Sequence, residues 1–232
     1  MCTLTYLLND DGYELFFNRD EQRSRALATP PTMHQKTNAI YPTDPQGQGT
    51  WIAVNKQGLS FALLNHYQGS FNDNKEIVSR GQLILSLLEL CGTGDDIIEK
   101  FEMMKLGVYQ PFQLCIFPKN LSLKNQVVYS FKWTGSKLYL SDADLPITSS
   151  SVDFLEVSQK RKQRFNDIVD MEIPLVQQHK DFHFSTETIS NQSVNMERKD
   201  AKTVSISHIS VNDKIRFNYF DNVVMQEHFT IF

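Results

Sequence analysis

The chain has 232 residues, of which 41% are hydrophobic and 22% charged, and its formal net charge is −4 at pH 7. This size and composition predict an ordinary globular protein, and we treat residues 1–232 as a single domain. The mildly acidic balance gives no reason to expect nucleic acid or an anionic membrane surface as a partner.

Two alternating or continuously apolar runs, CTLTYLL and YELFF, flank the sequence NDDG. Such a pattern predicts a β-hairpin that turns at Asp11-Gly12. The following segment, residues 23–48, is rich in Pro, Thr and Asn and predicts an irregular excursion. TWIAVN and LSFALLN, separated by KQG, then predict a second hairpin whose two faces are both covered.

Helical spacing of apolar residues begins at Lys75 and continues to Cys91, where Gly92 supplies a stop signal. Thr93 and two early acidic residues predict the capped start of a second helix. Strand-like runs return with FQLCIF, VVYSFKW, KLYLS and LPITSSS.

Residues 153–171 predict a long helix with Phe154, Val157, Phe165 and Ile168 on one side. After a stretch near 172–200 that we expect to be irregular, TVSISHISV, KIRFNYF and VVMQEHFTIF predict closing strands. The order of strands, helices, strands, helix and strands favours an α+β fold, with helices layered on antiparallel sheets.

The three cysteines, Cys2, Cys91 and Cys115, are widely spaced and form no CxxC pair. This pattern favours neither a disulfide framework nor a structural metal site, and nothing in the sequence implies a cofactor. The first apolar run is too short for a signal peptide, and no stretch approaches the roughly 18 apolar residues of a membrane span. We therefore expect a reduced, cytoplasmic protein without an integral membrane segment.

Cys2 directly follows the initiator methionine, and a small second residue predicts that Met1 is removed. Removal would leave one residue with both a thiol and an α-amine, and the amine has a reference pKa of about 7.7–8.0. That amine could accept the thiol proton, so the residue would supply nucleophile and base together. The alternative is that Cys2 is a small buried strand residue.

A polar cluster, Asn18-Arg19-Asp20-Glu21, ends the strand that is predicted to pair with the strand of Cys2. The hairpin would bring Arg19 and Asp20 beside Cys2, where an Arg favours the thiolate and an Asp could orient the amine. The alternative is a solvated strand end with a local ion pair.

Four ordered motifs, CTLTY, FFNRDEQRSR, YPTDPQGQGTWIAVNKQG and FALLN, resemble the NRDE family, also called the transport and Golgi organisation 2 family. The N-terminal plan is also similar to that of the choloylglycine hydrolases, which are N-terminal-nucleophile hydrolases with an αββα sandwich. The resemblance implies that Cys2 matches their nucleophile and that Arg19 and Asp20 match the Arg and Asp around it. Those two residues are separated in the bile salt hydrolases and are adjacent here.

The resemblance also implies that Asn65, at the end of the second hairpin, matches an oxyanion-stabilising Asn. Asn65 could instead bond the backbone at a strand end. Two departures are visible: Ser149 stands where the hydrolases carry a second active-site Asn, and their late active-site Arg is matched best by Arg198.

Two classes of function remain open. The first is a cysteine amidohydrolase that cleaves a linear amide C–N bond of a small molecule, with Cys2, Arg19, Asp20, Asn65 and Arg198 as its site. The second, implied by the resemblance, is a binder or carrier of a small hydrophobic or anionic ligand, in the handling of lipid, acyl-CoA or haem. The oligomeric state is left open by the sequence.

Three weaker signals favour structural roles. The Gly-x-Gly in QGQGTW precedes a strand rather than a helix, so it indicates a turn rather than a phosphate-binding loop. His179 and His183 have i,i+4 spacing without an intervening acidic base, which favours ordinary surface or core histidines over a metal site. The basic run Lys160–Arg164 is typical of a solvated helix face.

Overall fold

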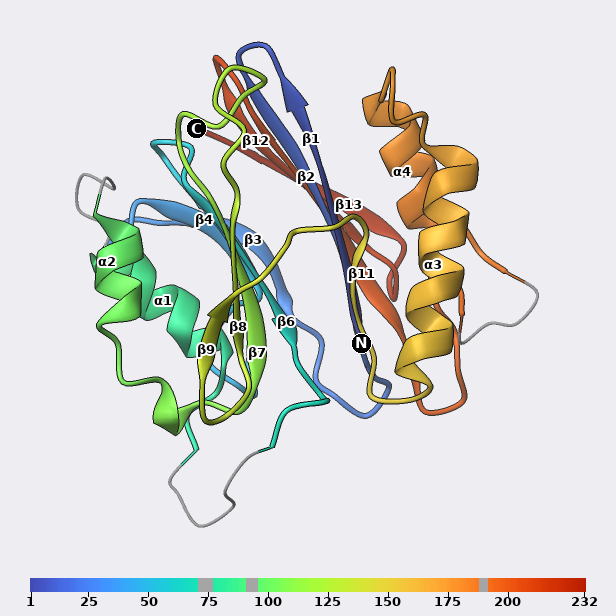
Figure 1. Cartoon of the computed structure of the whole chain (residues 1–232), viewed down its shortest axis with the longest axis horizontal. Coiled ribbons are helices and arrows are strands. Elements are labelled where there is room, and N and C mark those ends of the chain that lie inside the picture. Colours follow the sequence, from blue (N-terminus) through green and yellow to red (C-terminus); the bar gives the residue numbers. More distant parts are fainter. Residues whose placement is uncertain (71–76, 91–95, 188–191) are drawn as a thin grey trace. The chain divides into compact units, whose positions relative to one another are not determined.

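The computed structural model describes residues 1–70, 77–90, 96–187 and 192–232. The chain divides into two compact units, and each contains one antiparallel sheet with helices (Figure 1). Unit 1 consists of Met1–Arg25, Leu121–Gln126 and Ala143–Phe232, and unit 2 of Ala26–Asn120 and Val127–Asp142.

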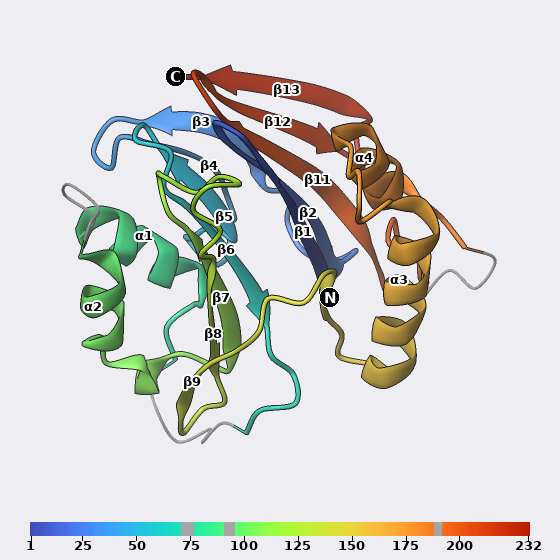
Figure 2. The ribbon, with the colours of Figure 1, turned by 45° about the horizontal axis from the view of Figure 1, so that its top comes forward.

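Unit 1 is built on a six-stranded sheet with the strand order β10-β1-β2-β11-β12-β13. Its strands are β1 (Cys2–Asn9), β2 (Gly12–Gln22), β10 (Ile147–Ser149), β11 (Ala201–Val211), β12 (Ile215–Asp221) and β13 (Gln226–Ile231). Two helices, α3 (Phe154–Ile168) and α4 (Val176–Phe184), pack against each other and against one face of this sheet (Figure 2). Because alternate strand residues point to opposite faces, only every second residue of β1 and β2 meets these helices.

The hairpin of β1 and β2 confirms the first prediction, with one change in its turn. Asn9 pairs with Gly12, so Asp10 and Asp11 form the turn and Gly12 is the first residue of β2. A Cβ atom on Gly12 would lie 1.8 Å from the carbonyl oxygen of Val211. The glycine is therefore required by the close approach of β11.

Unit 2 is built on a seven-stranded sheet with the order β3-β4-β5-β6-β7-β8-β9. Its strands are β3 (Thr29–His34), β4 (Ala39–Thr43), β5 (Ile52–Asn55), β6 (Ser60–Asn65), β7 (Phe112–Phe117), β8 (Tyr129–Trp133) and β9 (Leu138–Leu140). The helices α1 (Gly81–Leu90) and α2 (Ile97–Glu102) and a short 3₁₀ turn (Leu106–Val108) accompany them. Leu83 and Leu87 of α1 and Phe101 of α2 are fully buried in one core with the sheet residues Phe61 and Phe112.

The α+β class with antiparallel sheets is confirmed, and two predicted irregular segments are wrong. Residues 23–48 contain β3 and β4, and β3 accommodates Pro30 and Pro31 because it lies at the sheet edge, where a missing N–H group costs little. The segment near 172–200 contains α4, whose weak amphipathic pattern hid it.

Element boundaries differ at two helices. The helix predicted for 153–171 is three residues shorter at its C-terminal end, because it ends at Ile168. The helix predicted from Lys75 begins only at Gly81, and Lys75, Cys91, Gly92 and Thr93 lie outside the described residues. Within the described ranges, no helix has the length and apolar character needed to cross a membrane.

Candidate functional site around Cys2

Residue 1 and Asp20 are joined by their backbones at the start of the hairpin. The Asp20 N–H donates to the Met1 carbonyl at 3.0 Å, and the Met1 α-amine donates to the Asp20 carbonyl at 3.3 Å. An antiparallel ladder alternates hydrogen-bonded and non-hydrogen-bonded pairs, so the next pair, Cys2 and Arg19, is of the close, non-hydrogen-bonded kind. The predicted approach of Arg19 to Cys2 is therefore built into the strand register.

Cys2 lies between two strands, because it pairs with Arg19 of β2 on one side and with Ser149 of β10 on the other. Directly paired residues project from the same face, so these three side chains share one surface of the sheet. All three residues are buried, and among the described residues the Ser149 hydroxyl has no hydrogen-bond partner. The strand β10 thus places Ser149 beside the thiol, where the related hydrolases were expected to carry an Asn.

Burial raises the pKa of the Cys2 thiol above its ordinary value, while the nearby Met1 α-ammonium opposes this shift. The carboxylates of Asp20 and Glu21 raise the pKa further. With Met1 in place, the thiol is therefore held as a neutral group. Formation of a thiolate requires a change at the terminus or a compensating charge.

The Asp20 side chain points to the opposite face of the sheet from Cys2 and Arg19. Its Oδ2 lies 3.2 Å from Nη2 of Arg161 on α3, and its Oδ1 accepts a hydrogen bond of 2.6 Å from the hydroxyl of Thr203. Arg19 and Asp20 are adjacent in sequence and so alternate across the sheet. The Asp20 backbone bonds the amine and the carbonyl of Met1, whereas its carboxylate faces the helices.

Arg161 is a central residue of unit 1 that the sequence interpretation missed. Its side chain is fully buried and also donates to the hydroxyl of Thr3 and, at 2.7 Å, to the carbonyl of Ser193. The prediction of a solvated basic run is therefore wrong at this position. The sequence did carry a signal, because Arg161 stands four residues from both Val157 and Phe165 on the predicted apolar stripe.

The side chain of Met1 is buried in a small apolar cluster with Val157, Met196 and Ala201. Arg198 Nη1 lies 3.5 Å from the Met1 sulfur, and the same guanidinium pairs with Asp200. The structure thus places Arg198 at the edge of the Met1 cluster.

Next to the hairpin, His179 and His183 of α4 form a buried polar network with β1 and β2. Asn18 Nδ2 donates to the carbonyls of His183 and Val194 at 2.8 and 2.9 Å, so its Oδ1 is the acceptor for His183 Nδ1 at 2.6 Å. His183 Nε2 must then accept from Thr5 Oγ1 at 2.8 Å. The Thr5 oxygen in turn accepts from His179 Nδ1 at 2.9 Å.

This network keeps both histidines neutral. Burial lowers the pKa of His179 to about 4 and lowers the pKa of His183 well below its usual range. The interpretation of these residues as core histidines is confirmed by their burial and stacking on Phe16. Across the described residues, no group of three His, Cys, Asp or Glu side chains is arranged to hold a metal ion.

Asn65 lies in unit 2, at the last position of β6, where it pairs with Phe112 of β7. Its side-chain amide donates to the hydroxyl of Tyr67 at 2.9 Å. Four of the five predicted site residues, Cys2, Arg19, Asp20 and Arg198, lie in unit 1. Of these, only Arg19 shares the face of Cys2. The Asp20 carboxylate faces the helices, and Arg198 contacts Met1. Asn65 belongs to unit 2.

Three solved structures resemble the chain over most of its length. Penicillin V acylase from Agrobacterium tumefaciens has a TM-score of 0.56 and 9% identity, and the match covers 99% of this chain and 85% of that one. A Caenorhabditis elegans orthologue of N-acylethanolamine-hydrolyzing acid amidase has a TM-score of 0.57 and 11% identity, with 90% of this chain and 92% of that one covered. A single-residue variant of conjugated bile acid hydrolase from Clostridium perfringens has a TM-score of 0.51 and 12% identity, with 97% and 92% covered. At these identities the likeness establishes the fold, which is that of the N-terminal-nucleophile hydrolases.

The sequence also identifies the family to which the chain belongs. The family model described as Transport and Golgi organisation 2 matches residues 1–220, and the chain belongs to this family. A search of curated proteins gives no match. The predicted family and fold are thus confirmed.

Proposed function

We propose that the protein is an N-terminal-cysteine amidohydrolase that cleaves a linear amide C–N bond of a small molecule. The observation that carries the proposal is the double pairing at the hairpin end. Cys2 stands directly opposite Arg19, and residue 1 is bonded to the backbone of Asp20. This register sets the Cys2 thiol and the Arg19 cation on one face of a strand pair, on a fold shared with amide-cleaving enzymes.

The reaction requires removal of Met1, which converts the Cys2 nitrogen into a free α-amine. That amine takes the thiol proton, and the sulfur attacks the substrate carbonyl to form a tetrahedral oxyanion. Collapse of this tetrahedral intermediate breaks the C–N bond. The Cys2 α-ammonium gives its proton to the substrate nitrogen, which leaves as an amine, and the acyl group stays on the sulfur as a thioester. Water then cleaves the thioester and regenerates the thiol.

The remaining site residues have distinct proposed roles. The Arg19 guanidinium would favour the thiolate across the strand pair. The proposal also requires Asp20, whose backbone bonds Met1, to hold the new Cys2 amine once Met1 is removed. Asn65 is proposed as the oxyanion donor, a role typically worth about 3 kcal/mol of barrier. Arg198 would border the space that the Met1 side chain occupies.

The test combines mass and reactivity. Intact-mass analysis of the protein from its native host is expected to show loss of Met1. An acylating thiol probe is expected to label Cys2, and released amine is expected from a panel of N-acyl amides. Cys2→Ala should abolish both signals, whereas Cys115→Ser, a change at a buried cysteine of unit 2, should leave them intact. Retention of Met1 in the host would end the hydrolase proposal.

A second candidate function is a non-enzymatic binder of a small hydrophobic or anionic ligand. It is favoured by the burial of Met1 and by Ser149, whose hydroxyl cannot replace both faces of an amide. Loss of Met1 together with full biological activity of Cys2→Ala would support this candidate over the enzyme.

We also propose that residues 1–232 act as one domain in the cytoplasm. The family match across both units supports the first point, and the wide spacing of the cysteines, with no CxxC pair, supports the second. A single cooperative unfolding transition and recovery in the cytosolic fraction are the expected results. Two separate transitions, or recovery in a secreted or organellar fraction, would contradict the respective point.

A further inference from the structure

A cavity lies in unit 1, between α4 and the outer strands of the sheet. It has a volume of about 630 Å³, within the range of small-molecule sites. None of the predicted site residues lines it. Strand residues of the sheet form the floor of this cavity, and residues of α4 form its wall.

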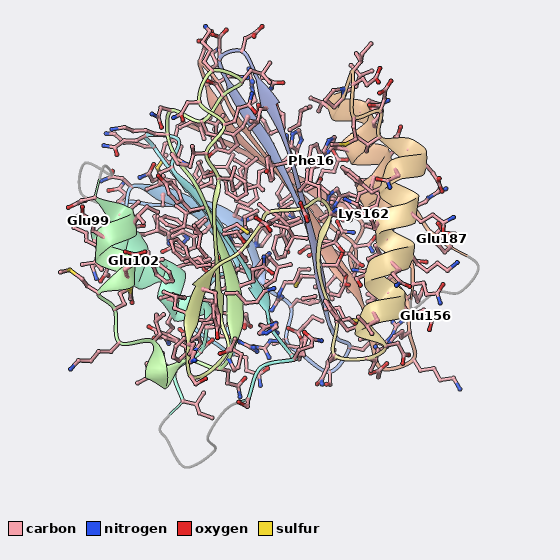
Figure 3. The ribbon with its side chains drawn as sticks, in the orientation of Figure 1. Phe16, Glu99, Glu102, Glu156, Lys162 and Glu187 are labelled. Carbon is pink, nitrogen blue, oxygen red and sulfur yellow. The ribbon has the colours of Figure 1, made fainter. Side chains whose placement is uncertain are left out.

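The floor consists of two neighbouring rungs of the sheet. In the first, Phe16 pairs with His208, His208 with Asn218, and Asn218 with Phe229. In the second, Ile206 pairs with Phe220 and Phe220 with Glu227. Paired residues project to the same side of a sheet. Phe16 stacks on His183 of α4, so its rung and the neighbouring rung both face this helix. Phe16 is labelled in Figure 3.

The wall is one stripe of α4. Val176, Lys180 and Phe184 recur at intervals of four and line the cavity, while His179, Phe182 and His183 bury the other side of the helix against β1 and β2. Phe184 and Phe220 both line the cavity, and their ring centroids are 5.3 Å apart. Phe229 remains 60% exposed on β13, although it belongs to the floor.

The polar groups of the cavity indicate what it would bind. In the described part of the chain, neither the Lys180 ammonium nor the exposed Glu227 carboxylate has an ion-pair partner, and the Asn218 amide has no hydrogen-bond partner. His208 is held in place by Glu14, whose Oε2 lies 2.7 Å from its Nε2, and its ring stacks on Phe16 with centroids 4.1 Å apart and planes 7° apart. A flat ring system can continue this stack across the floor, while an anionic group reaches Lys180.

We propose that this cavity is a binding site for a small aromatic monoanion, separate from the Cys2 site. Aromatic floor residues supply the contact area, Lys180 supplies the charge, and Asn218 supplies a hydrogen bond. Cys2 lies on β1 with its side chain on the opposite face of the sheet. Binding here therefore does not depend on the proposed hydrolase activity.

The test compares two probes that share their rings but differ in charge. The anion 8-anilino-1-naphthalenesulfonate is expected to bind saturably with one molecule per chain, and the neutral N-phenyl-1-naphthylamine is expected to bind more weakly. Lys180→Gln should weaken binding of the anion about fivefold, as expected for loss of a partly exposed ion pair, without changing binding of the neutral probe. Phe229→Ser should weaken both probes about tenfold through lost apolar contact.

Matched controls separate the cavity from general surface binding. Lys160→Gln on the exposed side of α3 and Ile231→Ser on the same edge strand as Phe229 should each leave the affinities within about twofold of those of the parent protein. Circular dichroism checks that each variant is folded. Cys2→Ala should bind both probes normally, so a failed hydrolase test leaves this proposal standing. Equal affinity for the two probes, or insensitivity to both Lys180→Gln and Phe229→Ser, would overturn it.

Discussion

Asp20 Oδ2 and Arg161 Nη2 lie 3.2 Å apart, and neither side chain is exposed to solvent. This pair ties α3 to the strand that carries Arg19. Each partner compensates the charge of the other, and the Asp20 carboxylate also accepts a hydrogen bond from Thr203. Burial of one charge without its partner is costly, which makes the pair a sensitive point of unit 1.

Arg161→Met is expected to lower the free energy of unfolding by about 3–5 kcal/mol, because it leaves the Asp20 carboxylate buried and unpaired. Urea denaturation measures the change. Asp20→Asn combined with Arg161→Met should recover part of the loss, since neither charge then remains. Arg164→Gln is the control on the same helix: its half-exposed pair with Glu187 should contribute less than about 1 kcal/mol. Equal losses for Arg161→Met and Arg164→Gln would contradict the role assigned to Arg161.

The buried histidines predict a dependence of stability on pH. Their folded-state pKa values lie below the unfolded-state value of about 6.5, so the unfolded chain takes up protons first as the pH falls. Stability from these residues is present above pH 6.5 and decreases from about pH 6.5 toward 4, by up to about 1.4 kcal/mol per pH unit for each histidine.

Denaturation at pH 7, 6 and 5 checks this slope. His179→Gln should make it shallower, because one of the two protonation sites is lost and Gln can still donate to Thr5. Gln177→Ala, on the exposed side of the same helix, should preserve the slope. A stability that stays constant between pH 7 and 5 would show that these imidazoles are not kept neutral in the folded protein.

Ser149 and Thr203 are both buried hydroxyl residues of the same sheet, but they are predicted to respond differently to removal of the hydroxyl. Ser149→Ala should change the free energy of unfolding by less than about 0.5 kcal/mol, because among the described residues its hydroxyl has no partner. Thr203→Val should cost about 1–3 kcal/mol, since the Thr203 hydroxyl bonds both Asp20 and the N–H of Met196. A large stability loss for Ser149→Ala would show that its hydroxyl is engaged. Normal stability with changed Cys2 reactivity would support a place for Ser149 in the site.

The buried thiol of Cys115 is expected to react with alkylating reagents only when the protein is unfolded. Burial raises its thiol pKa to about 12, so almost no thiolate is present at pH 8. Iodoacetamide should leave Cys115 unmodified in the folded protein and alkylate it readily in denaturant, as measured by peptide mass mapping. Alkylation of Cys115 at the same rate in the folded and unfolded protein would contradict this expectation.

Much of the fold could be predicted from sequence, because hairpins and closing strands carry alternating apolar residues between turn signals. The exceptions have physical causes. Consecutive prolines suggested a loop at 29–34, but an edge strand tolerates them. The helix α4 buries two histidines and a phenylalanine, a face that hydrophobic periodicity does not recognise.

The candidate site was partly predictable for the same reason. Hairpin register alone brings Arg19 to Cys2, so that relationship followed from spacing. The partners of the Asp20 carboxylate could not be identified, because Arg161 and Thr203 are more than 140 residues away and come into contact only through packing. The apolar stripe of α3 did include position 161, and a charged residue on such a stripe indicates a buried partner.

The burial of Met1 has a consequence for how the protein is made. Its side chain is packed against Val157, Met196 and Ala201, and its amine is bonded to Asp20. An aminopeptidase needs an extended, accessible terminus, which the folded chain does not offer. The removal of Met1 that the hydrolase proposal requires would therefore have to precede closure of the hairpin, while the nascent chain is still leaving the ribosome. Rapid overproduction would then favour folded chains that retain Met1.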